Sequence, residues 1–185
     1  MRKTVAIIII LVLAAVIGFV YLGIEQVVQE KMHPLEYSEY VEKYSQQYSV
    51  PKEIVYAVIK TESSFKSDAV SKKGAIGLMQ ITPDTYAWLC TKDSFSSDSA
   101  DMLYNPEINI KAGTLFLSLL YSEYGIWENV YAAYNAGRAK VNEWLEDEKY
   151  NDNGHLINIP YKETASYIVK VTKAADIYTS LYFEN

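Results

Sequence analysis

The hydrophobic pattern begins with an unbroken uncharged run from Thr4 to Ile24, which follows the basic residues Arg2 and Lys3. As a helix this run would be roughly 31 Å long, the thickness of a bilayer's hydrocarbon core. A cleaved signal peptide has a shorter apolar region and a small-residue cleavage site, which Val16-Ile-Gly18 matches poorly. The pattern predicts one transmembrane helix in an anchor over residues 1–24, with a cleaved signal as the alternative. Basic residues stay cytoplasmic, so the remainder is expected outside the cell membrane.

The segment 25–34 is short and polar, and we predict that it forms a stalk. From residue 35 to 185 the apolar residues recur at helical spacing, and no stretch alternates with period two long enough to indicate a convincing strand. Thr82-Pro83, Asn105-Pro106 and Pro160 are typical helix starts, and Gly125 is a typical helix end. The polar segments 67–73, 93–101 and 146–155 read as loops, the second of them serine-rich and mobile. The sequence therefore predicts a single all-α domain over residues 35–185.

One carboxylate continues an apolar stripe. Val55, Val58, Ile59 and Glu62 fall at i, i+3, i+4 and i+7 of a helix that we expect to begin with Pro51 as its first helical residue. The residues that follow are weak helix formers, so the acid is predicted at the last turn, facing a cleft. An apolar surrounding raises the pKa of a carboxyl, and a protonated acid near neutral pH can donate a proton to a glycosidic oxygen. Taken alone the signal is weak, because a glutamate at a helix end is more often solvated or capping.

Composition narrows the function. The formal charge of −6 argues against nucleic acid as a partner. Cys90 is the only cysteine, which excludes an intramolecular disulfide and a cysteine metal cluster. The chain also has 17 tyrosines. Tyrosines at this frequency fit either a carbohydrate groove or packing at the edge of the core, and the sequence does not decide between them.

Four motifs occur in order. They are Glu62-Ser63, Gly77-Leu-Met-Gln80, Ala133-Tyr-Asn-Ala-Gly137 and Ile159-Pro-Tyr-Lys-Glu163-Thr-Ala-Ser-Tyr167. Together they resemble the catalytic domain of soluble lytic transglycosylases, whose fold is similar to goose-type lysozyme. The resemblance covers about residues 35–178. It implies a lysozyme-like helical fold with peptidoglycan as substrate, and no metal or cofactor.

The resemblance also implies roles for single residues. Glu62 would be the sole catalytic carboxyl: it would protonate the bond between N-acetylmuramic acid and N-acetylglucosamine, then deprotonate the C6 hydroxyl that closes a 1,6-anhydro ring. That internal nucleophile removes the need for a second carboxylate. Seven residues would line the groove and contact substrate: Ser71, Met79, Gln80, Tyr134, Asn135, Glu163 and Tyr167.

For several of these residues an ordinary structural role is the alternative. Ser71 could be a plain loop serine, the Gly77-Leu-Met-Gln80 segment a tight turn under the core, and Glu163 with Tyr167 a helical surface pair, since they are four residues apart. Glu163 is the internal rival for the acid role. Its place in the first turn of a helix favours the charged form, so it is the poorer proton donor.

Two other functions remain open at this stage. One is hydrolysis of the same bond, as in goose-type lysozyme, which would need a positioned water. The other is an inactive module that binds the cell wall, which predicts a damaged acid position, whereas Glu62 is intact. A cell-wall or secretion-machinery protein is a possible partner, and the loops 93–101 and 146–155 are where we would expect it to bind.

Overall fold

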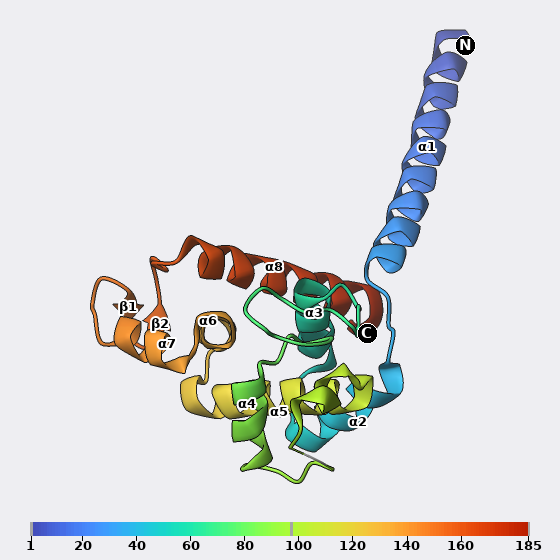
Figure 1. The fold of residues 1–185 in the computed structure, drawn as a ribbon. Coiled ribbons are helices and arrows are strands. Elements are labelled where there is room, and N and C mark those ends of the chain that lie inside the picture. Colours follow the sequence, from blue (N-terminus) through green and yellow to red (C-terminus); the bar gives the residue numbers. More distant parts are fainter. Residues whose placement is uncertain (1, 97, 185) are drawn as a thin grey trace.

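The computed structural model describes residues 2–96 and 98–184, with side chains from Leu11 onward. Residue 97, within the loop predicted at 93–101, lies outside the described residues, as do residues 1 and 185. Helices dominate the described chain (Figure 1). The elements, in order, are α1 Arg2–Met32, α2 Ser38–Tyr48, α3 Lys52–Glu62, α4 Pro83–Cys90, η1 Ala100–Tyr104, α5 Pro106–Tyr124, α6 Trp127–Ala136, α7 Arg138–Leu145, β1 Asn151–Asp152, β2 His155–Leu156, α8 Lys162–Tyr178 and η2 Thr179–Phe183.

Helix α1 projects from the helical domain as a single long rod (Figure 1). It includes a stretch, Leu11–Met32, that is long and apolar enough to cross a membrane, a test that a signal sequence near the N-terminus also passes. The helix continues without interruption through most of the segment where we predicted a stalk. The predicted stalk is thus helical up to Met32, because the residues from Glu25 to Met32 are mostly good helix formers.

The base of α1 is fastened to the opposite end of the chain. The Tyr182 hydroxyl donates a hydrogen bond to the carbonyl of His33 at 3.0 Å, and the Tyr178 hydroxyl donates one to the carbonyl of Pro34 at 3.1 Å. The buried His33 ring packs edge-on against the Tyr178 ring, with centroids 5.4 Å apart. These contacts hold the residues directly after α1 against the C-terminal end of the domain.

The core is formed where α3 packs against α8, α6 packs against α5 and α8, and α2 packs on α5. Because α8 covers both α3 and α6, the ends of these three helices meet on one face. Helix α5 is buried almost all round. The sequence predicted an apolar stripe on α5 that includes Ile108, Ala112, Leu115, Phe116 and Leu119. Ala112 and Leu115 are buried as expected, whereas the other three are only partly buried. Ile110, Leu117 and Leu120 are completely buried instead.

The helix starts and ends that the sequence predicted are largely confirmed. The Thr82 hydroxyl accepts a hydrogen bond from the Thr85 amide, and the Asn105 side chain accepts from the first amides of α5. Gly125 ends α5 with φ of 65°. Two starts were wrong: Pro51 is the N-cap of α3 rather than its first helical residue, and α8 begins at Lys162, not at Pro160. The loop at 146–155 also contains a two-residue antiparallel hairpin, β1–β2, which is too short for a periodic pattern to show.

Candidate active site

Helix α3 ends at Glu62 because the backbone turns sharply directly after it. Ser64 and Phe65 both adopt left-handed conformations, with φ of 51° and 65°. Such conformations cost a non-glycine residue of order 1 kcal/mol and persist only where the surroundings enforce them. Here the Phe65 side chain is buried in the core, and the Ser64 hydroxyl donates back to the carbonyl of Lys60. The turn therefore places the Glu62 side chain at the end of its helix, as predicted.

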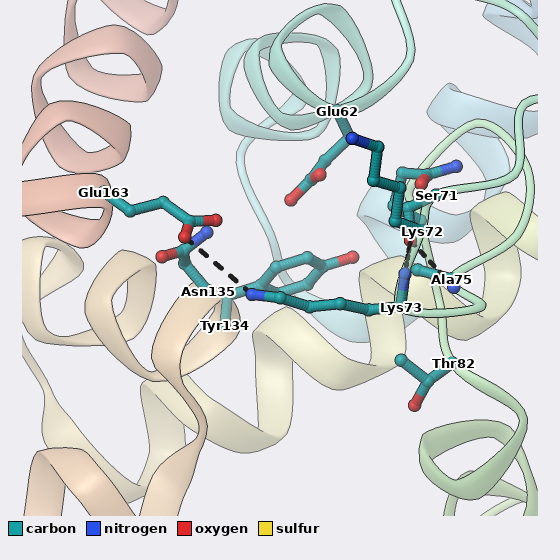
Figure 2. Close-up of a pocket in the computed structure, with 10 residues that line it drawn as sticks. Glu62, Ser71, Lys72, Lys73, Ala75, Thr82, Tyr134, Asn135 and Glu163 are labelled. Carbon is teal, nitrogen blue, oxygen red and sulfur yellow. Dashed lines mark hydrogen bonds and ion pairs between the residues drawn. The ribbon is translucent and has the colours of Figure 1, made fainter. Parts of the chain in front are cut away.

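Glu62 faces a cleft that encloses about 320 Å³ (Figure 2). One wall of this cleft is the end of α3 with the segment 71–82, and the other is the end of α6 with the start of α8. Ten residues line it: Glu62, Ser71, Lys72, Lys73, Ala75, Gln80, Thr82, Tyr134, Asn135 and Glu163. The predicted site residues thus meet in one cleft, apart from Met79 and Tyr167.

Burial raises the pKa of the Glu62 carboxyl from an ordinary 4.5 to about 7. Loss of hydration is the main cause, because a low-dielectric surrounding disfavours the charged form. The negative charge of Glu163 raises the pKa further, and the Tyr167 hydroxyl opposes both by stabilising the carboxylate. A carboxyl with this pKa is present in both protonation states near neutral pH, so it can act as an acid and then as a base.

Two tyrosine hydroxyls lie near the Glu62 carboxyl, that of the partly buried Tyr134 and that of the buried Tyr167. The Tyr134 hydroxyl donates a hydrogen bond of 2.8 Å to the carbonyl of Met79. The Tyr167 hydroxyl is buried and lies close enough to Glu62 to lower its pKa, yet it completes no hydrogen bond of ordinary geometry with any described group. Burial and the nearby Glu62 charge raise the pKa of both phenols well above 10, so both stay protonated. Tyr167 is therefore a buried proton donor beside the acid.

The loop that forms the first wall is held by hydrogen bonds from its own side chains. The Ser71 hydroxyl accepts hydrogen bonds from the amides of Lys73 and Ala75, at 3.3 and 3.0 Å. The Gln80 amide nitrogen donates to the carbonyls of Ala69 and Gly77, at 3.1 and 2.9 Å. Both side chains line the cleft while fixing the loop, so the structural and the substrate-contacting interpretations are compatible. The Ser71 proton and the Gln80 carbonyl remain for a ligand.

Met79 does not line the cleft, contrary to our expectation. Its side chain is completely buried and packs against Gly113, where an added Cβ would lie 2.3 Å from the Met79 sulfur. The apolar thioether is drawn into the core, and only the backbone of Met79 serves the site, as acceptor for Tyr134.

Asn109 on α5 holds this segment in place and was missed by the sequence analysis. Its side-chain oxygen accepts from the Met79 amide at 2.8 Å, and its nitrogen donates to the carbonyls of Ile76 and Leu103 at 2.9 and 2.8 Å. An added Cβ at Gly77 would lie 2.3 Å from the Asn109 amide nitrogen. The glycine therefore allows the loop to close onto the asparagine. The sequence of α5 gave no signal for this role, because the helix carries several other polar residues.

The opposite wall is polar. The Asn135 side-chain oxygen accepts a hydrogen bond of 2.8 Å from the Thr164 hydroxyl, which leaves the Asn135 amide nitrogen available to the cleft. Glu163 is exposed and pairs with Lys73 across the cleft, with 3.8 Å between Nζ and Oε2. Lys72, Lys73 and Thr82 also line the cleft, and the sequence analysis did not predict them as site residues.

Fold and cleft together define an all-helical, lysozyme-like domain with one desolvated carboxyl in an open groove. The chain belongs to the transglycosylase SLT domain family, whose match covers residues 39–157.

Named relatives and solved structures agree with this assignment. The soluble lytic murein transglycosylase of Escherichia coli K12 is 32% identical, over 77% of this chain and 23% of its own length. Membrane-bound lytic murein transglycosylase C of Glaesserella parasuis is 30% identical, over 78% of this chain and 46% of its own length.

Among solved structures, an inactive mutant of the lytic transglycosylase Slt from Pseudomonas aeruginosa has a TM-score of 0.72 and 30% identity, covering 80% of this chain and 24% of that one. A complex of the 70 kDa soluble lytic transglycosylase with bulgecin A has a TM-score of 0.75 and 29% identity, covering 82% and 25%. The chain therefore spans about a quarter of the soluble relatives and just under half of the membrane-bound one.

Proposed function

We propose that this chain is a peptidoglycan lytic transglycosylase that cleaves the bond between N-acetylmuramic acid and N-acetylglucosamine and leaves a 1,6-anhydro end. The observation that carries the proposal is Glu62, whose carboxyl has a pKa of about 7 and faces the cleft. The only other carboxylate that lines the cleft within the described residues is Glu163, which is exposed and paired with Lys73. One carboxyl is therefore poised for proton transfer, and a scheme with an internal nucleophile needs only one.

In the proposed reaction Glu62 first donates its proton to the oxygen of the leaving N-acetylglucosamine as the bond to C1 breaks. The C6 hydroxyl of the same muramic residue then attacks C1, and Glu62 takes up the hydroxyl proton, which returns the carboxyl to its starting state. The Tyr167 hydroxyl, which stays protonated beside Glu62, can donate to the carboxylate between the two steps. Such a contact would stabilise the transient negative charge in a site with little water.

We propose further that α1 is a single transmembrane anchor and that the cleft lies on the extracytoplasmic side. Three features support this: the apolar stretch Leu11–Met32, the basic residues Arg2 and Lys3 before it, and a relative whose name describes it as membrane-bound. Basic residues that flank a span favour the cytoplasmic side.

The test uses the full chain in detergent with purified peptidoglycan sacculi. We expect anhydromuropeptides among the products by mass spectrometry, and we expect Glu62→Gln to abolish their release, because glutamine cannot donate or accept this proton. Glu148→Gln is the control for the substitution itself, since Glu148 is exposed on a loop and does not line the cleft. Reducing-end muramic acid would instead indicate hydrolysis, and undiminished release by Glu62→Gln would refute the assignment of the acid.

A further inference from the structure

The mouth of the cleft is crossed by one side chain. Lys73 extends from the wall formed by residues 71–82 toward Glu163 at the start of α8, as Figure 2 shows. Their ion pair is the only salt bridge across the cleft among the described residues. A glycan strand bound in the cleft beside Glu62 would therefore lie close to this ion pair.

The Lys73–Glu163 pair is weak enough to open. Its two side chains are 81% and 73% exposed, and the 3.8 Å separation is long for a charge-assisted hydrogen bond. Exposed pairs of this kind contribute little, because water screens the charges and two long side chains lose freedom. The bridge is therefore a contact that a substrate can displace.

A second cation lies beside it. Lys72 also lines the cleft and is exposed, and within the described part of the chain it forms no ion pair or hydrogen bond through its side chain. The surrounding segment 66–73 contains three lysines and one aspartate, although the whole chain has a net charge of −6. Two of these lysines, Lys72 and Lys73, line one wall of the cleft in an otherwise acidic protein, and such a local positive charge attracts an anionic ligand.

We propose that Lys72 and Lys73 bind a carboxylate of the glycan substrate and so determine which strands are cleaved efficiently. This inference rests on the proposed function, because it assigns a feature of the same substrate. Peptidoglycan offers two such carboxylates: those of the peptide stem, and the lactyl carboxylate of a muramic residue whose stem has been removed. On binding, the Lys73 ammonium exchanges the Glu163 carboxylate for the carboxylate of the strand, so the bridge opens without leaving the lysine unpaired.

The test compares three substrates with the full chain in detergent. The first is strands with peptide stems, the second is strands stripped by an amidase, which carry only lactyl carboxylates, and the third is strands whose carboxylates have been converted to amides. kcat and KM are measured for the wild type, for Lys72→Gln, for Lys73→Gln and for the double variant. Lys66→Gln is the matched control, because Lys66 is exposed in the same segment but does not line the cleft.

We expect each single variant to raise KM about two- to five-fold on strands that carry the recognised carboxylate, and the double variant about ten-fold. The change should fall mainly on KM, because the contact lies away from the reacting bond. A rise in KM on stem-bearing strands would identify the stem carboxylate as the bound group. A rise in KM on stripped strands would identify the lactyl carboxylate. An equal loss on amidated strands, or a loss no larger than that of Lys66→Gln, would overturn the proposal. Wild-type cleavage of amidated strands separates this outcome from a failure of the proposed function.

Discussion

Replacing Glu62 by glutamine should make the protein more stable at neutral pH while it removes activity. The pKa of the carboxyl is raised from 4.5 to about 7 in the folded protein, so folding penalises the ionised form. The penalty is absent below pH 4.5, grows as the pH rises toward 7 and is constant above it. A difference of this size corresponds to about 3 kcal/mol at pH 8 and to nearly nothing at pH 4. Glutamine carries no charge, so Glu62→Gln is free of this penalty.

Thermal unfolding of the full chain in detergent, followed by circular dichroism at pH 4 and pH 8, measures the effect. Relative to wild type, we expect Glu62→Gln to raise the melting temperature at pH 8 by roughly 6 to 12 °C more than at pH 4. The pH-dependent part is diagnostic, because altered hydrogen bonds shift stability equally at both values. Glu148→Gln, on an exposed loop, should show no such difference. If the gain of Glu62→Gln were independent of pH, the carboxyl would not be desolvated and the acid role would lose its physical basis.

Two further results are expected. The alkaline limb of the pH profile of kcat/KM should fall near pH 7, because protonated Glu62 is lost there, and Glu163→Gln should move it to lower pH, since the Glu163 charge raises the pKa of Glu62. The measured quantity is the pH at which the alkaline limb falls, not the maximal rate. An alkaline limb that stayed at the same pH or moved to higher pH would contradict the effect of the Glu163 charge on Glu62. Gly77→Ala should destabilise the fold by about 2 to 4 kcal/mol in denaturant unfolding, because φ is +78° and the new Cβ would overlap Asn109. Gly74→Ala has the same φ with nothing within 4 Å, so it should cost only about 1 kcal/mol, and equal costs at the two glycines would refute the packing argument.

The sequence predicted features that depend on neighbours along the chain. Thr82, Asn105 and Gly125 act within a few residues of their own positions, so their roles as caps were readable. The position of Glu62 at a helix end was readable for the same reason, and the family resemblance indicated which later motifs would meet it. The cleft confirms that meeting for Ser71, Gln80, Tyr134, Asn135 and Glu163.

Features that depend on distant segments were not readable. Asn109 is 30 residues from the amide that it accepts from, and nothing in its local sequence distinguishes it from a solvated asparagine. Lys73 and Glu163 meet only because α8 folds back over α3. Met79 was expected in the cleft because it belongs to the motif Gly77-Leu-Met-Gln80. Its side chain is instead completely buried against Gly113, which lies in another helix. Tertiary packing decided each of these.

The attachment of the end of α1 to the C-terminal part of the domain has a mechanical consequence. A protein held by a flexible tether searches a hemisphere whose radius is the length of the tether. Here the helix continues to Met32, and Tyr178 and Tyr182 clamp the residues just after it. If the bilayer encloses the uncharged run 4–24, and not the whole stretch Leu11–Met32, the last eight residues of α1 would raise the domain by about 12 Å. The cleft would then stay at one height above the membrane. It would reach new substrate through lateral diffusion of the anchored protein, whereas a flexible tether would let the domain move by itself.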